Sequence, residues 1–186
     1  MTKKLIIIIS SVTILGGLLA WLFVESSKPP PGEKITDLGR EHIEIGKEVK
    51  YNSNPPTSGS HYVEWIKAGV YETPKDDRNL VHSLEHGYVI MHYKCQGASM
   101  EASQSASIAS SSAQLDSSCR EKKGQLEEVF NSKEQRKLIV VPRSDLDTNF
   151  ALTAWTYIDK LDDFDRARIE KFIDAHLNQG PEKTME

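Results

Sequence analysis

A run of twenty uncharged, mostly apolar residues from Leu5 to Val24 constrains the fold of this chain more than any other feature. Twenty residues form a helix about 30 Å long, which matches the hydrocarbon core of a bilayer. Two lysines precede the run and a glutamate follows it, so the amino terminus is expected in the cytoplasm. We therefore predict a cytoplasmic tip over residues 1–4, a transmembrane helix over residues 5–24 and an extracytoplasmic location for the remainder.

A cleaved signal peptide is the alternative interpretation of the same run. The apolar region of a signal peptide usually has about 7 to 15 residues, fewer than are present here. Val24 and Ser26 could form a cleavage site, and no cysteine follows that could accept a lipid. Under both interpretations the rest of the chain is exported. The length of the run favours an uncleaved anchor at the cell membrane.

The exported part is mildly acidic and large enough for one domain. The whole chain has a net charge of −4, and without Lys3 and Lys4 the charge is −6. Because no basic patch is evident, a nucleic-acid partner is not expected, whereas a membrane-protein partner is possible. A proline-rich linker is predicted over residues 25–37, one extracytoplasmic domain over residues 38–182, and a short tail over residues 183–186.

The pattern of apolar residues predicts an α+β fold, with a small mixed or antiparallel sheet and two to three helices after the transmembrane helix. Extended segments are expected to dominate the first half of this domain, and helices the second half. The extended segments are expected at His42–Tyr51 as two short strands or a hairpin, and at Trp65–Tyr71, Tyr88–Lys94, Leu138–Val141 and Ala151–Ile158. Helices are expected at about Arg120–Phe130 and around Ile169–Leu177.

The chain has two cysteines, Cys95 and Cys119. An even pair in an exported protein indicates a disulfide. The bond would close a loop of about 25 residues and stabilise the fold by roughly 3 kcal/mol. A thiolate metal site or a redox pair is the weaker alternative, because the spacing is not that of a Cys-x-x-Cys motif.

The sequence His-Ser-Leu-Glu-His-Gly at residues 82–87 places two imidazoles and a carboxylate in one short segment. In a helix, His82, Glu85 and His86 share one face, with the histidine Cβ atoms roughly 6 Å apart. In an extended strand the two histidines would lie about 13 Å apart. Asn79 could cap the start of a helix and Gly87 suits the left-handed position after its end. A short helical turn is therefore predicted.

Five segments together resemble a known bacterial family. They are YNSNPPTSGSHY, GVY, VHSLEHGYVIMHY, ALTAW and a final helix that ends in GPE. Over roughly Leu38 to Glu182 the chain is similar to the family catalogued as "domain of unknown function 3105", although Ser60 stands where the family pattern usually has proline. The resemblance implies a single membrane-anchored exported domain, and it implies no established activity.

The motif positions that match this family hold five candidate ligands. These are His42, His61, His82, Glu85 and His86. Three separate segments thus present imidazoles, as metal sites commonly require. Imidazole and carboxylate ligands without a free thiol favour zinc, copper(II) or nickel over copper(I). The ion is expected to bind through His61, His82 and His86, with His42 and Glu85 completing or supporting the shell. Glu85 is expected either to bind the ion or to hold the second nitrogen of a histidine. The sequence therefore predicts a divalent transition metal, most simply zinc or copper, handled at the envelope.

Two alternatives remain open at this point. In the first, the histidines form a hydrogen-bonded network in a structural or adaptor domain. In the second, the His-x-x-Glu-His spacing is that of the inverted zincins, in which the glutamate activates a zinc-bound water for peptide hydrolysis. That signature needs a long helix, whereas Gly87 is expected to end the helix here. Enzymatic activity is therefore an open question, and a non-enzymatic role is favoured.

The proline-rich turn over residues 54–59 precedes His61. Its two prolines and its glycine predict a rigid corner that aims the His61 side chain. An anion-binding loop is the alternative, but the turn lacks the glycine density and the lysine of a phosphate loop.

Overall fold

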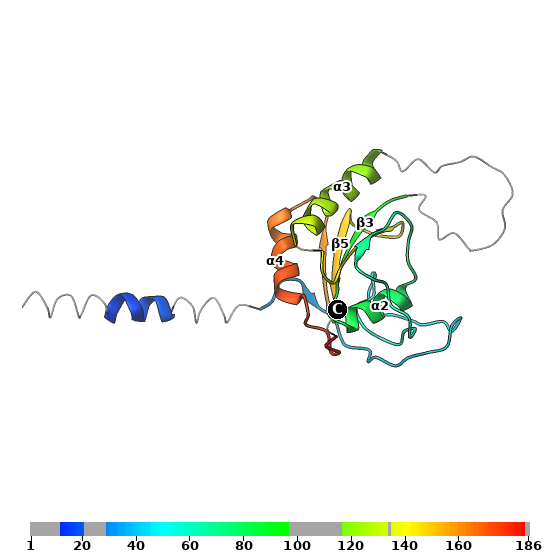
Figure 1. Cartoon of the computed structure of the whole chain (residues 1–186), viewed down its shortest axis with the longest axis horizontal. Helices are drawn as coiled ribbons and strands as arrows, with labels where there is room; N and C mark the ends of the chain where they lie inside the picture. Colours follow the sequence, from blue (N-terminus) through cyan, green and yellow to red (C-terminus); the bar gives the residue numbers. More distant parts are fainter. Residues whose placement is uncertain (1–11, 21–28, 97–116, 134, 185–186) are drawn as a thin grey trace, which may run out of the picture. The chain divides into compact units, whose positions relative to one another are not determined.

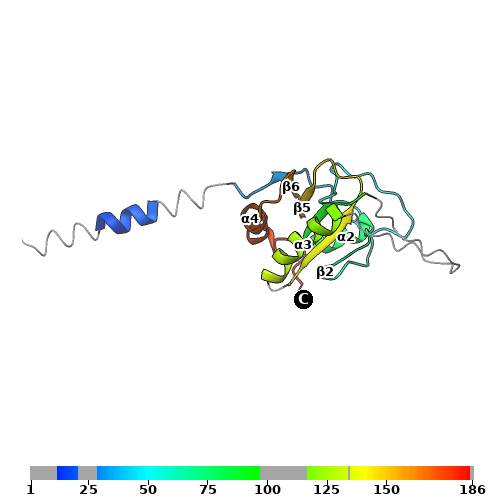
Figure 2. The same cartoon turned by 90° about the horizontal axis from the view of Figure 1, so that it is seen from above.

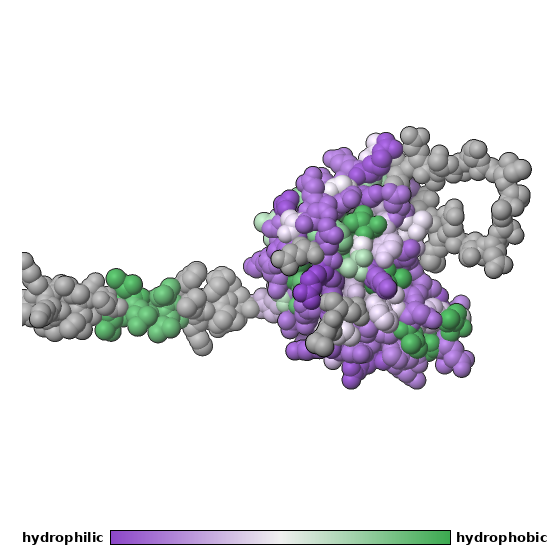
Figure 3. All heavy atoms as spheres, viewed as in Figure 1, coloured by the Kyte–Doolittle hydropathy of each residue, from purple (hydrophilic) through white to green (hydrophobic). Residues whose placement is uncertain are grey.

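The computed structural model describes residues 12–20, 29–96, 117–133 and 135–184. The chain divides into two compact units, Met1–Pro30 and Pro31–Glu186, and each is described by itself. In the first unit residues 12–20 are helical, and their apolar side chains are exposed (Figure 3). Within the described ranges, no helix combines the length and the apolar character needed to cross a bilayer. The remainder of the predicted span over residues 5–24 lies outside the described residues, so the transmembrane helix stays a prediction.

The second unit has the predicted α+β fold, but its mixed sheet of six strands is larger than expected. The strands lie in the order β1-β6-β5-β3-β4-β2. Their bounds are β1 (Glu33–Lys34), β2 (Gly69–Val70), β3 (Val89–Lys94), β4 (Leu138–Arg143), β5 (Phe150–Ala154) and β6 (Tyr157–Leu161). The helices are α2 (Asp77–Glu85), α3 (Ser117–Ser132) and α4 (Arg166–His176). Strands β2, β3 and β4 run parallel to one another, and the other neighbouring pairs are antiparallel.

Helices cover both faces of the central strands, with α3 and α4 on one face and α2 on the other (Figures 1 and 2). Alternate residues of a strand point to opposite faces. Val89 and Met91 of β3 therefore pack with α3 and α4, whereas Ile90 between them packs with Leu80 and Leu84 of α2. This burial on both faces explains why β3 is a nearly continuous apolar run, and it fixes α2 against the sheet.

Two expectations about the strands were wrong. Residues His42–Tyr51 form no hairpin, and His42 makes only an isolated parallel bridge with His61. The segment Ala151–Ile158 is not one strand, because β5 and β6 form an antiparallel pair that turns at Trp155 and Thr156. Thr156 has a φ of 61°, an uncommon conformation for a β-branched residue.

The expected division into a strand-rich first half and a helix-rich second half was also wrong, because β4, β5 and β6 all lie in the second half. In addition, β4 does not end before Pro142 but runs through it. Strand β2 pairs only with Ile139 and Val140 of β4. From Pro142 onward, β4 therefore has an open side, where the missing amide hydrogen removes no sheet hydrogen bond.

The predicted disulfide between Cys95 and Cys119 is confirmed, with a Cα–Cα distance of 5.1 Å. Cys95 follows the end of β3 and Cys119 lies in the first turn of α3. Both cysteines are buried in the core between the sheet and α3. The bond therefore fixes the start of α3 to the sheet.

Candidate metal centre

Helix α2 carries two of the candidate ligands, and its boundaries differ slightly from those expected. The helix begins after Asp76, whose side chain accepts a hydrogen bond from a backbone amide of the first turn. Asn79 is therefore not the cap, and its side-chain amide donates instead to the carbonyl of Glu64 at 2.7 Å. The helix ends at Glu85, and Gly87 adopts the predicted left-handed conformation with a φ of 81°.

The next pair of candidates comes from two segments that run side by side. His42 and His61 form a parallel bridge. The amide of Ile43 donates to the carbonyl of His61, and the amide of His61 donates to the carbonyl of Glu41, both at 2.9 Å. This pairing brings His42 beside His61, whose side chain is fully buried, while the His42 side chain is 46 % exposed.

The structure brings four of the five predicted residues to a common point. One ligand atom from each of His42, His61, His82 and Glu85 lies within 4.8 Å of the others. The ring centroids of the three histidines are each 5.0 Å from the other two. Among the four, only His42 is exposed. The result is a compact set of three imidazoles and one carboxylate that reaches solvent at one residue.

The fifth predicted residue, His86, lies outside this group. Its Nε2 atom is 3.0 Å from Nε2 of His82 and 3.9 Å from a carboxylate oxygen of Glu182. His86 is the residue that caps the carboxyl end of α2. His86 therefore contacts His82 at the edge of the group and also lies near the carboxylate of Glu182.

Backbone carbonyls determine which ring nitrogen is protonated in the two most buried histidines. Nδ1 of His61 is 2.7 Å from the carbonyl oxygen of Gly59, and Nδ1 of His82 is 2.7 Å from that of Tyr62. A carbonyl oxygen only accepts, so each Nδ1 must donate, and the neutral ring then has its lone pair on Nε2. Histidines that bind metals typically donate their other nitrogen to a carbonyl or carboxylate in this way.

The lone pairs of the two neutral rings therefore lie on Nε2, and that of His82 is 3.0 Å from Nε2 of His86. Nε2 of His61 is 2.9 Å from a carboxylate oxygen of Glu85, whose side chain is 4 % exposed. A lone pair and a carboxylate at this distance repel each other unless a proton or a metal cation lies between them. The arrangement therefore requires a proton or a metal cation between the His61 ring and the Glu85 carboxyl group.

Burial favours the neutral, metal-binding form of His82. Desolvation lowers the pKa of the His82 imidazole, against the hydrogen bond to the Tyr62 carbonyl, which raises it. The neighbouring histidines His86, His61 and His42 lower the pKa further. The ring thus keeps its Nε2 lone pair to a lower pH than an exposed histidine would.

Sequence patterns missed three residues at the edge of the group. A guanidinium nitrogen of Arg40 is 3.6 Å from a Glu85 oxygen. The Trp65 ring centroid lies 5.7 Å from that of His82 and 5.1 Å from that of His86. Glu182, near His86, belongs to the GPE segment that carries the family resemblance. That segment was the only sequence feature that pointed to Glu182. No motif spacing pointed to Arg40 or Trp65.

The carboxyl-terminal segment packs directly against the end of α2. The amide of Glu182 donates to the carbonyl of Glu85 at 3.0 Å, and the amide of Asn178 donates to that of Gly87 at 2.8 Å. A Cβ atom on Gly180 would lie 2.2 Å from the Glu85 carbonyl oxygen. Only glycine permits this approach, which holds the backbone of Glu85 in place.

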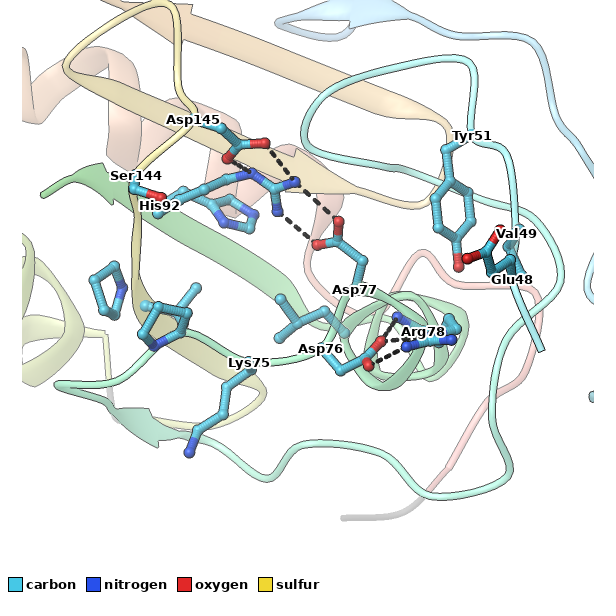
Figure 4. Close-up of a pocket in the computed structure, with 15 residues that line it drawn as sticks. Glu48, Val49, Tyr51, Lys75, Asp76, Asp77, Arg78, His92, Ser144 and Asp145 are labelled. Carbon is cyan, nitrogen blue, oxygen red and sulfur yellow. Dashed lines mark hydrogen bonds and ion pairs between the residues drawn. The ribbon is translucent and has the colours of Figure 1, made fainter. Parts of the chain in front are cut away.

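A separate cavity of about 520 Å³ lies at the opposite end of α2 (Figure 4). Its charged residues largely pair with one another: Arg78 contacts Asp76, and Arg143 contacts Asp77 and Asp145. None of the four clustered residues lines it.

His92 is the buried histidine of this cavity, and its side chain contacts Thr153. Desolvation, with a smaller contribution from Arg143, holds the pKa of His92 well below its usual value. The ring is therefore kept neutral, which fits a histidine that supports the fold.

The fold and the site define an α+β domain with a buried histidine–glutamate cluster. The chain belongs to the family described as "Protein of unknown function (DUF3105)", whose model matches residues 42–186. The resemblance in the sequence is thus confirmed, and the family description assigns no activity. No curated protein and no solved structure matches the chain.

Proposed function

We propose that the domain binds one divalent transition metal ion through the imidazoles of His42, His61 and His82 and the carboxylate of Glu85. The observation that supports this most is the location of the lone pairs on Nε2, because backbone carbonyls fix the protons of His61 and His82 on Nδ1. A cation among these ligands would remove the repulsion between the His61 lone pair and the Glu85 carboxylate. It would also add to the compensation of the buried Glu85 charge, which Arg40 contacts at 3.6 Å.

The types of ligand indicate the metal. Three imidazoles and one carboxylate can complete a four-coordinate zinc site, and imidazole also suits copper(II) and nickel. Both cysteines form the disulfide, so no thiolate is available to favour copper(I). Zinc and copper(II) are therefore the ions that we assign to the site.

The exposed position of His42 supports a role in metal handling. The other three ligands are buried, and the exposed imidazole of His42 offers an incoming or departing ion a route to solvent. Such a site suits the sensing, delivery or storage of a metal at the envelope. A disulfide fits an oxidising compartment, which agrees with the proposed extracytoplasmic location of this domain behind its membrane anchor.

The main alternative is a network without metal, in which a protonated His61 pairs with Glu85 in a structural or adaptor domain. The two accounts differ in their response to added metal. The hydrolase alternative receives less support, because Glu85 lies among the candidate ligands and α2 ends at that residue.

Thermal unfolding of the metal-free, full-length protein separates these accounts. At free zinc or copper(II) near 100 times the dissociation constant, we expect a stabilisation of about 2.7 kcal/mol. Glu85→Gln should lose most of this gain, because a neutral amide is a weak ligand for these ions.

Glu182→Gln is the matched control, because it changes a carboxylate that lies near His86 but outside the four ligands. It should be stabilised by metal as strongly as the wild-type protein. The proposal would be refuted if neither metal raised the melting temperature of the wild-type protein. It would also be refuted if metal stabilised the Glu85→Gln variant as much as the wild-type protein.

A further inference from the structure

The cavity at the amino-terminal end of α2 is lined by a buried histidine, His92 (Figure 4). His92 lies on the same face of β3 as Ile90, which packs against α2. Its ring is 1 % exposed, and its Nε2 atom is 3.1 Å from the Thr153 hydroxyl. Within the described ranges, the Nδ1 atom of His92 has no hydrogen-bond partner. A buried nitrogen without a partner costs free energy, which a ligand that forms the missing hydrogen bond would recover.

The charges around Arg143, on the same side of the cavity, have an excess of one negative charge. The guanidinium donates to both carboxylate oxygens of Asp77, at 2.5 and 2.9 Å. Its Nε atom is also 2.8 Å from a carboxylate oxygen of Asp145. One positive charge therefore faces two negative charges, and the surplus favours a cation over an anion.

The other charged residues of the lining do not cancel this surplus. Arg78 forms a pair with Asp76. The ammonium of Lys75 lies 4.5 Å from the centroid of the Tyr71 ring, and Figure 4 shows it directed away from the Arg143 ion pairs. Glu48 adds another carboxylate, and in the described parts of the chain it forms no ion pair.

The capacity for hydrogen bonds also favours a ligand that donates. Arg143 already directs its N–H groups to Asp77 and Asp145, whereas each carboxylate has about four lone-pair sites and keeps some of them. Desolvation holds the pKa of His92 well below its usual value, so the neutral ring does not repel a cation. When Nε2 of His92 donates to Thr153, Nδ1 presents a lone pair.

The size and the walls of the cavity favour an organic cation over a metal ion. Among the described residues, the carboxylates of this cavity and His92 do not form a group of three ligand atoms close enough to hold one ion. The cavity has a volume of about 520 Å³ and aliphatic walls at Leu80, Val141 and Pro142. Cavities of this volume commonly hold small organic ligands.

We propose that this cavity binds a small aliphatic ammonium ion, such as a protonated primary amine. An ammonium has three donors, and they match the carboxylates of Asp77 and Asp145 and the Nδ1 atom of His92. The aliphatic body lies against Leu80 and Val141, where it buries apolar surface. The proposal does not depend on the metal ion, because none of the four clustered residues lines this cavity.

A nuclear magnetic resonance titration with cyclohexylammonium tests this proposal on the full-length protein in detergent with a chelator present. A ligand of this size should bind with a dissociation constant of about 1 mM or lower. Asp145→Asn should weaken binding by about tenfold, because it removes the surplus negative charge. The side chain of Asp145 is 60 % exposed, so this variant should fold. The ¹⁵N resonance of His92 Nδ1 should shift on binding, whereas the ring resonances of His176 should not.

Asp147→Asn is the matched control, because Asp147 is an exposed aspartate that pairs with Lys160 and does not line the cavity. This variant should bind cyclohexylammonium as the wild-type protein does. The uncharged cyclohexanol should bind more weakly, and equally well to the wild-type protein and to Asp145→Asn. Absence of binding, an unchanged affinity in Asp145→Asn, equal wild-type affinities for the two probes or an unshifted His92 Nδ1 resonance would overturn the proposal.

Discussion

Replacing His61 by alanine is expected to weaken the binding of zinc or copper(II) by about 100-fold or more, as the loss of a direct ligand should. His61 is fully buried, and its Nδ1 atom is held by the Gly59 carbonyl. Its Nε2 atom is therefore oriented before the ion arrives, and no other side chain can replace it without rearrangement of the buried group. Competition titrations against a chelator of known affinity, with the metal-free protein, measure the change.

Two further variants make this result specific. His176→Gln removes a histidine that is also buried but contacts the carbonyl of Pro31 instead of the group, so it should leave the affinity unchanged. His42→Ala changes the exposed ligand and should weaken binding by about tenfold, since water can fill an exposed position. Wild-type affinity in both His61→Ala and His42→Ala would show that the ion binds elsewhere.

Gly180→Ala is expected to destabilise the folded protein by about 3 kcal/mol or more. The new Cβ atom would lie 2.2 Å from the carbonyl oxygen of Glu85 and 2.3 Å from the amide nitrogen of Gly87. Both contacts are with backbone atoms, so the segment after α4 or the end of α2 has to move. Urea denaturation in the presence of a chelator measures the loss without a contribution from metal.

Gly124→Ala is the control for the Gly180 substitution. Gly124 lies within α3, and an added Cβ atom there meets no atom within 4 Å. Alanine favours a helix over glycine, so this variant should gain about 0.5 to 1 kcal/mol. A free energy of unfolding of Gly180→Ala close to that of the wild-type protein would contradict the close packing between Gly180 and the end of α2.

Local spacing was enough to predict the part of the site that lies on α2. His82 and Glu85 are three residues apart, so any helix places them on one face. The same rule placed His86 near His82, but the helix ends at Glu85 and His86 is its cap. The spacing therefore predicted that His86 lies near His82. It could not determine which residues form the candidate metal site.

The pairing of His42 with His61 could not be derived from local patterns. It depends on a single bridge between two segments without regular structure. Alternation of apolar and charged residues suggested a hairpin at His42–Tyr51, but no partner strand buries one of its faces. Only the family motifs indicated that both histidines belong to one site.

The fold class was predictable because β3 and the closing helix have strong apolar patterns. The division between β5 and β6 was missed because the turn at Trp155 and Thr156 lacks the Asn-Gly or Gly residues that usually mark a two-residue hairpin. The run of β4 through Pro142 depends on the short length of β2, which no pattern within β4 reveals.

Anomalous diffraction from crystals soaked with zinc or copper(II), recorded at the absorption edge of the metal, is the most direct test of the metal site. We expect one strong peak about 2 Å from Nε2 of His61 and of His82, with a Glu85 oxygen completing the contacts. A map without a peak among these side chains, or with its main peak at the carboxylates around Arg143, would contradict the proposed metal centre.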